Sequence, residues 1–127
     1  MRIQRAEKSG FLTLKGFNLT SIPPEVFTIK GLKTLILSNN PLTEISPEIG
    51  KLQDLKNLHL SDCQLSSELF PAEFSSLKLD ELNLANNMLT DINFLVGIKT
   101  LKRINLMGNE ILDLPLEVDI PNPSYAI

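Results

Sequence analysis

Leucine and isoleucine recur along this chain in a pattern that restarts every 22 to 24 residues. Residues 32–42 read LKTLILSNNPL, with apolar residues at positions 1, 4, 6 and 11 and an asparagine at position 9. The pattern starts again at Leu55, Leu79 and Leu101, and a weaker copy starts at Ser9. These five copies predict five stacked coils, because a period of about 20–29 residues is typical of a solenoid.

Alternation inside each copy predicts a short strand. Leu35 and Leu37 should face inward and Ile36 outward, since successive side chains of a strand point to opposite faces. One coil cannot bury its leucines alone, so each coil stacks on the next and the strands pair in a parallel sheet. The residue at position nine leaves the strand, and an asparagine there can satisfy backbone groups that the turn leaves unpaired. The position-nine residues are Phe17, Asn40, Cys63, Asn87 and Asn109.

The segments between the strands predict a convex side without a second sheet. Prolines at positions 23, 24 and 47 remove backbone donors, which favours irregular structure. From Leu89 to Leu101 an apolar residue occurs at every third position, a spacing that predicts 3₁₀ turns or a short helix. The third copy is longer in this half, and we expect its Phe70 and Phe74 to be partly buried. The predicted fold is an α/β solenoid of about five coils, with a parallel concave sheet and an irregular or 3₁₀ convex side.

The length of 127 residues suits a single domain. We expect residues 1–8 to form an N-terminal cap, residues 9–118 to form the five repeats and residues 119–127 to form a C-terminal tail. A cap is expected because an uncovered sheet edge invites association with other chains.

The repeated pattern L-x-x-L-x-L-x-x-N-x-L resembles the leucine-rich repeat family. Residues 6–27, AEKSGFLTLKGFNLTSIPPEVF, resemble the first coil of its small intracellular members. Residues 91–111, DINFLVGIKTLKRINLMGNEI, resemble the 22-residue type found in protein-phosphatase-1 regulators and splicing-factor subunits. The resemblance implies a right-handed horseshoe segment that acts as a non-catalytic protein-interaction module, with phosphatase regulation as one alternative.

Composition narrows the partners and the compartment. A net charge of −3 argues against nucleic acid or an acidic membrane surface as the main partner. The single cysteine allows no intrachain disulfide, and the sequence shows neither a secretory leader nor an apolar run of about 18 residues. We therefore expect a cytoplasmic protein, monomeric, with no membrane contact.

Catalytic and cofactor chemistry is not expected. The phosphate-binding motif GxxxxGK is absent, and one histidine with one cysteine cannot build a His/Cys metal site. His59 and Cys63 would lie about 13 Å apart along an extended chain, too far for a nucleophile and its base. Ser61 and Asp62, beside His59, are ordinary surface residues in this pattern. We expect no enzyme and no cofactor, with Cys63 buried in a turn.

The outward residues of the strands should gather on one face, where solenoids commonly bind partners. Its charges are mixed, so it does not suit a phosphate backbone. Phe11, Ile36 and Met107 place apolar side chains on this wet face, and aromatic and arginine residues are common anchors in protein interfaces. The residues expected to bind a protein or peptide are Phe11, Thr34, Ile36, Asn57, His59, Glu81, Asn83, Arg103, Asn105 and Met107.

A further outward column is expected beside these residues, flanked by a rim of Asn39, Asp62 and Asn86. Five strands about 4.8 Å apart span only about 20 Å, which suits a weak or peptide-sized contact. The alternative is a structural segment of a larger repeat protein with no site of its own. The further column consists of Lys15, Ser38, Ser61, Ala85 and Met107.

Overall fold

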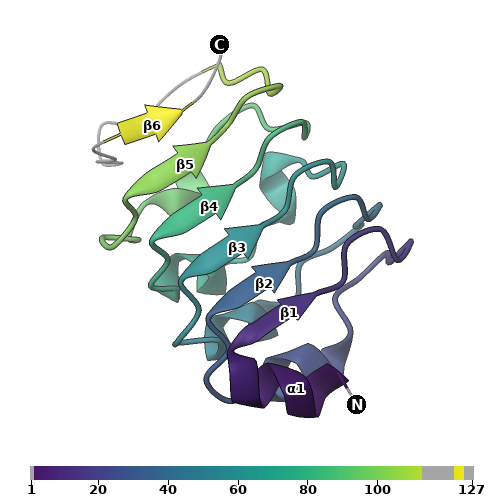
Figure 1. The fold of residues 1–127 in the computed structure, drawn as a ribbon. Coiled ribbons are helices and arrows are strands. Elements are labelled where there is room, and N and C mark those ends of the chain that lie inside the picture. The colour runs from purple at the N-terminus through teal and green to yellow at the C-terminus, as the bar shows by residue number, and fades with distance from the viewer. Residues whose placement is uncertain (1, 113–121, 125–127) are drawn as a thin grey trace.

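The computed structural model describes residues 2–112 and 122–124. Short parallel strands lie side by side in chain order and form one sheet along the stack (Figure 1). Each is three residues long, because the template alternates for only a few positions before the chain turns out. The strands are β1 (Phe11–Thr13), β2 (Thr34–Ile36), β3 (Asn57–His59), β4 (Glu81–Asn83), β5 (Arg103–Asn105) and β6 (Asn122–Ser124).

The register of the first five strands follows the predicted template. Leu12 pairs with Leu35, Leu35 with Leu58, Leu58 with Leu82, and Leu82 with Ile104. These central residues are all buried, and the two neighbours of each lie on the outward side of the sheet. The predicted solenoid with a parallel sheet is confirmed.

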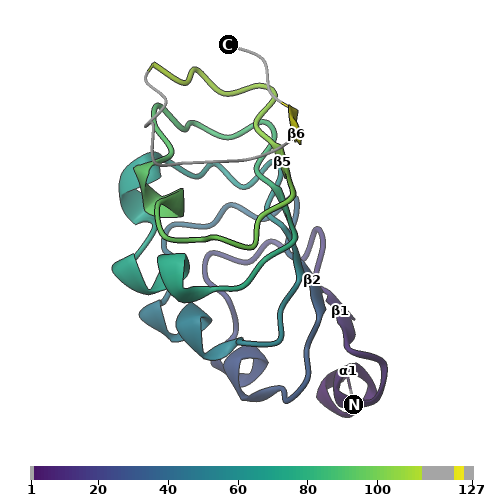
Figure 2. The same cartoon turned by 90° about the vertical axis from the view of Figure 1, so that its left-hand side faces the viewer.

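The convex side consists of 3₁₀ turns, which lie opposite the sheet (Figure 2). Pro24 and Pro47 stand at the start of two of them, where a missing N–H is tolerated. A short 3₁₀ turn at Asn93–Leu95 forms between Leu89 and Leu101, as the spacing of three predicted. The turns are η1 (Pro24–Thr28), η2 (Pro47–Lys51), η3 (Ser67–Leu69), η4 (Ala72–Ser76) and η5 (Asn93–Leu95).

The longer third coil is filled by an aromatic cluster. Phe70 stacks on Phe94 of the next coil with ring centroids 3.8 Å apart, and it meets Phe74 edge-on at 5.0 Å. Phe70 and Phe74 are therefore buried, and the expectation of partial burial was wrong. The repeat pattern does not predict this contact, because Phe94 comes from the following repeat and lies outside the leucine template.

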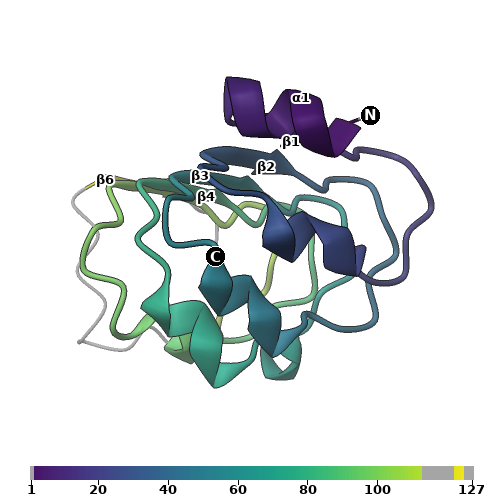
Figure 3. The same ribbon diagram turned by 90° about the horizontal axis from the view of Figure 1, so that it is seen from below.

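The N-terminal segment forms the helix α1 (Arg2–Ser9), which lies against the first coil (Figure 3). Ala6 is fully buried there, and the Gly10 N–H donates to the Ala6 carbonyl at 2.7 Å. Gly10 has a φ of 73°, so a residue without a Cβ suits the turn from helix to strand. A capping role for this helix stays a prediction.

The strand β6 is an addition to the five predicted strands. It pairs with β5 through the neighbours Ile104 and Pro123. Sequence reasoning placed these residues in a tail because NPS lacks the leucines of the template. The rest of that tail and the end of the predicted fifth repeat, residues 113–121 and 125–127, lie outside the described residues.

Candidate partner-binding surface

A buried asparagine ladder holds each strand at its exit. The Asn87 Oδ1 accepts hydrogen bonds from the backbone N–H groups of Cys63 and Leu65, both at 3.0 Å. Its Nδ2 donates to the Leu60 and Leu84 carbonyls at 2.9 and 3.0 Å. One side chain thus joins two coils, and the predicted ladder is confirmed at Asn40, Asn87 and Asn109.

Cys63 occupies the same position in the third coil and is fully buried, as predicted. Its thiol donates to the Leu37 carbonyl, with the sulfur 3.2 Å from the oxygen. Burial raises the pKa of the Cys63 thiol, although the nearby backbone groups of Asn40 and Asn39 act in the opposite direction. The sulfur is therefore held as a neutral thiol and is a poor nucleophile.

The outward strand residues align in two columns, which we call the concave face. Column one is Phe11, Thr34, Asn57, Glu81 and Arg103, and column two is Thr13, Ile36, His59, Asn83 and Asn105. Nine of the ten predicted partner-binding residues lie in these columns, and Met107 lies just beyond Asn105 with half of its surface exposed. The structure thus brings the predicted residues together on one surface, and their binding role stays a prediction.

The two ends of the concave face differ in character. At the N-terminal end Phe11 is 47% exposed and half-buried Ile36 lies in the next coil, so apolar surface meets water. At the other end the Arg103 Nη2 donates to the Glu81 Oε1 at 2.7 Å. This bond, and then the negative charge of Glu81, raises the pKa of Arg103, so the guanidinium stays charged.

A shallow hollow of about 250 Å³ lies over β3, β4 and β5. The side chains of His59, Glu81, Asn83, Arg103 and Asn105 line it. The Oδ1 atoms of Asn83 and Asn105 each accept a backbone N–H two residues on, at 3.0 Å. Their Nδ2 atoms donate to no other described residue, so both amides have donors to offer a ligand.

The third predicted column is largely closed, which corrects our expectation. Ser38 and Ala85 are buried, and the Ser61 hydroxyl donates to the Ser38 Oγ at 2.9 Å. These positions follow the strands, where the chain begins to turn inward, so small side chains pack there. Only Lys15 and Met107, at the two ends of this column, remain exposed.

The rim residues Asn39, Asp62 and Asn86 are exposed, and their backbone conformation explains their residue types. Asn39, Asp62 and Asn86 have φ values of 60°, 56° and 58°, and Gly16 and Gly108 at the same template position also have positive φ. Glycine and asparagine adopt this left-handed region most readily, so backbone conformation explains these residue types. The signal was present in the sequence as Gly, Asn, Asp, Asn and Gly at one repeated position.

No cluster of metal-ligating side chains is seen in the part of the chain that the structure describes. No group of three or more His, Cys, Asp or Glu side chains there converges on a possible metal ion. His59 is half-buried on the concave face, while Cys63 is enclosed in the core. Across residues 2–112 and 122–124, no helix has the length and apolar character needed to cross a bilayer.

Comparison with known proteins identifies the repeat. Residues 30–72 match the family described as leucine-rich repeats in two copies. A leucine-rich repeat protein of Leptospira interrogans superimposes with a TM-score of 0.75 and 27% identity, over 96% of this chain and 34% of that one. Human trophoblast glycoprotein, also named Wnt-activated inhibitory factor 1, superimposes with a TM-score of 0.55 and 20% identity, over 91% of this chain and 57% of that one.

The second of these likenesses concerns the fold alone. This chain spans about a third of the Leptospira protein and just over half of the human glycoprotein. No curated protein matches the sequence.

Proposed function

We propose that this chain, whose repeat matches the leucine-rich repeat family, binds a protein or a peptide through its concave face. Leucine-rich repeat domains typically bind proteins and are generally not enzymes. The observation that carries the proposal is the concave face itself, where exposed Phe11 and half-buried Ile36 lie in line with a polar hollow. An apolar anchor beside groups that orient a ligand is typical of a recognition surface.

The size of the concave face limits the ligand. The first five strands, about 4.8 Å apart, give a face about 20 Å long and a few hundred Å² in area. A standard interface buries about 800 Å² on each partner. The concave face alone thus suits a peptide or one short segment of a larger protein, held weakly, as in an adaptor or scaffold.

We further propose a monomer that works in the cytoplasm. The single, buried thiol supports this location, since such a chain gains nothing from an oxidising compartment.

Affinity purification with a pair of double variants tests the concave face. Ile36→Glu with Glu81→Arg changes the apolar and the charged end of the surface. The control, Val96→Glu with Glu25→Arg, makes the same chemical changes on the exposed convex side. We expect the concave variant to lose specific partners that the wild type and the control retain. If a folded concave variant keeps every specific partner, the proposal is wrong.

The second candidate function is that of a structural segment within a longer repeat array. The observation that favours it is the alignment of nearly the whole chain with 34% of the Leptospira protein. If a segment is all that these coils provide, the concave double variant will keep the same partners as wild type when both are expressed within the full-length native protein.

A further inference from the structure

Charged side chains are sorted between the two edges of the sheet. We define the amino edge as residues 28–34, 51–57, 75–81 and 97–103, which lead into β2, β3, β4 and β5. Eight basic and three acidic residues lie there. The remaining residues of 11–112 contain one basic side chain against eight acidic ones. A chain of net charge −3 therefore has one strongly basic border.

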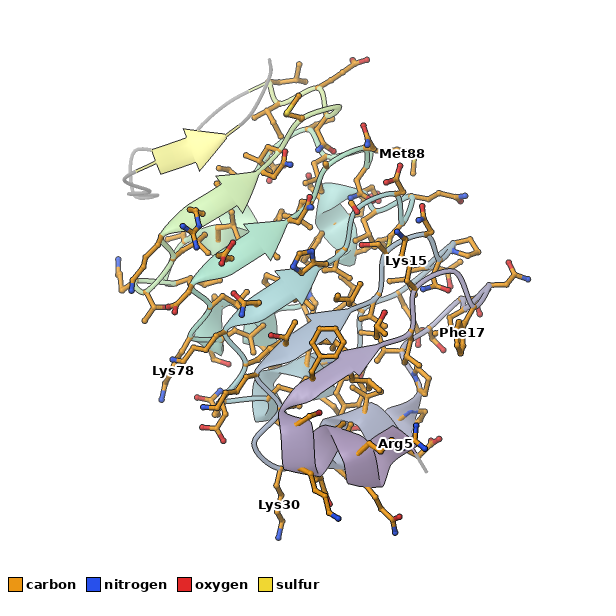
Figure 4. The ribbon with its side chains drawn as sticks, viewed as in Figure 1. Arg5, Lys15, Phe17, Lys30, Lys78 and Met88 are labelled. Carbon is orange, nitrogen blue, oxygen red and sulfur yellow. The ribbon has the colours of Figure 1, made fainter. Side chains whose placement is uncertain are left out.

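Figure 4 shows this separation directly. Lys30 and Lys78 extend from the amino edge, whereas Lys15, Phe17 and Met88 lie on the side where the strands end. Since Lys15 is the single basic residue outside the amino edge within 11–112, the opposite side of the concave face is electrostatically different.

The backbone stacks these lysines at the spacing of the strands. The Lys33 N–H donates to the Gly10 carbonyl, Lys56 to Lys33, Asp80 to Lys56, and Lys102 to Asp80, each at 2.8 Å. Residues stacked in this way lie about 4.8 Å apart from coil to coil. Lys33 and Lys56 are thus neighbouring like charges, an arrangement that repels unless an anion lies between or above them.

Most of these lysines form no ion pair with another residue that the structure describes. Within the described residues, Lys51 pairs with Glu48 and Arg103 pairs with Glu81. The amino-edge lysines without an ion pair among the described residues are Lys30, Lys33, Lys56, Lys78, Lys99 and Lys102.

A second hollow lies in the same border, between the turns that precede β2 and β3. Its volume is about 230 Å³, and Lys30, Lys51, Gln53 and Asp54 contribute to its lining. The turns that line this hollow lead into β2 and β3, whose outward residues belong to the concave face. A ligand that crosses the concave face would therefore pass its flanking residues over the amino edge.

We infer that the amino edge binds an acidic segment of a protein partner, rich in Asp or Glu. An unpaired lysine row attracts polyanions in general, but two features favour carboxylates over a nucleic acid. The single arginine of the amino edge, Arg103, is already paired with Glu81, and no exposed aromatic ring lies in the amino edge to stack on a base. Asp54 and Asp80 divide the row into short basic blocks, which suit a short acidic segment better than a long, continuous phosphate backbone.

The test measures binding of a fluorescent hexaglutamate peptide by fluorescence anisotropy. Lys33→Glu with Lys56→Glu reverses two charges at the amino edge. The control, Arg5→Glu with Lys15→Glu, changes net charge equally at two exposed positions elsewhere. We expect the amino-edge variant to bind about tenfold or more weakly, and the control to bind within about twofold of wild type. Wild-type affinity should fall as NaCl rises from about 20 to about 200 mM.

Three results would overturn the inference. They are an equal loss in the control, the absence of salt-dependent peptide binding, and tighter binding of an oligothymidylate of matched charge. If the first pair fails to fold by circular dichroism, Lys30→Glu with Lys78→Glu, both at exposed positions, replaces it under the same criteria. Ile36→Glu should leave hexaglutamate binding within about twofold, which separates this edge from the concave-face proposal.

Discussion

The third and fourth coils solve the same problem at the strand exit with different atoms. In the fourth coil, Asn87 accepts two backbone N–H groups and donates to two main carbonyl partners, all from buried positions. In the third coil, Cys63 offers a thiol that donates at 3.2 Å to one carbonyl of the coil below. A thiol is a weak donor and a weak acceptor, so it cannot replace the amide bond for bond.

The loop of the second coil compensates for the weaker hydrogen bonding of Cys63. In the first and third coils, the N–H groups of Leu19 and Leu65 donate to the asparagine Oδ1 of the following coil. The equivalent N–H of Leu42 instead donates to the Asn40 carbonyl two residues back, at 2.8 Å. Pro41 lies between them and fixes φ near the value that this three-residue turn needs. The repeat therefore tolerates cysteine at position 63, because the neighbouring loop provides an acceptor for its own Leu42 N–H.

Removal of the Asn87 side-chain amide should have the largest effect on the free energy of unfolding. Asn87→Ala leaves buried N–H and carbonyl groups of two coils without partners, and we expect a loss of about 3–5 kcal/mol in the free energy of unfolding. Urea unfolding followed by circular dichroism measures this loss. A loss under about 1 kcal/mol would show that water replaces the amide and that the ladder contributes little.

Removal of the Cys63 thiol should have a smaller effect on the free energy of unfolding. Cys63→Ala deletes one buried sulfur and a long hydrogen bond, so we expect a loss of about 1–2 kcal/mol. The same urea titration applies, with Asn87→Ala measured beside it. Equal losses in the two variants would abolish the distinction between the rungs.

A double-mutant cycle sharpens the link between Pro41 and Cys63. Cys63→Asn alone adds an amide oxygen to which the Leu42 N–H is not free to donate. Pro41→Gln alone frees the Leu42 N–H, but no amide oxygen is present to accept it. We expect the two changes together to be more stable than their sum predicts, by about 0.5–1 kcal/mol. Strict additivity would mean that the proline and the cysteine act independently.

The smallest effect concerns pH. Burial raises the pKa of Cys63 in the folded protein, so the unfolded chain loses its thiol proton first as the pH rises. The stability that depends on a neutral thiol is complete below the unfolded pKa of about 8.5 and decreases above it. Between about pH 8 and about pH 10, wild type should lose more stability than Cys63→Ala. A parallel decline would contradict this assignment.

The sequence was sufficient to predict the register because the spacing of the leucines is compatible with one pairing of the strands. Leu35 and Leu37 can be buried together only if their coils stack, and the pairing of Leu12, Leu35, Leu58, Leu82 and Ile104 follows from the spacing. The leucine pattern does not predict the Phe70–Phe94 stack, since that contact joins residues outside the template. It also missed β6, whose residues pair through the backbone without the apolar pattern.

The position of the concave face was predictable from the sequence. The burial of Ser38 and Ala85 in the predicted third column was not. Alternation along a strand places Glu81 and Arg103 outward, and their pairing follows from the register. Ser38 and Ala85 lie two residues past the ends of β2 and β4, where alternation no longer applies. The basic amino edge was also overlooked, because a net charge of −3 conceals how lysines are distributed in space.

The left-handed backbone at the strand exits restricts which side chains these surface positions can accept. A Cβ on Gly108 would collide with the side chain of Asn86, and Asn39 and Asp62 are held in the same backbone conformation. In a saturation mutagenesis scan, these positions should accept little beyond glycine, asparagine and aspartate. New binding specificities would then have to arise on the neighbouring strands and on the lysine border, where the backbone places no such demand on the side chain.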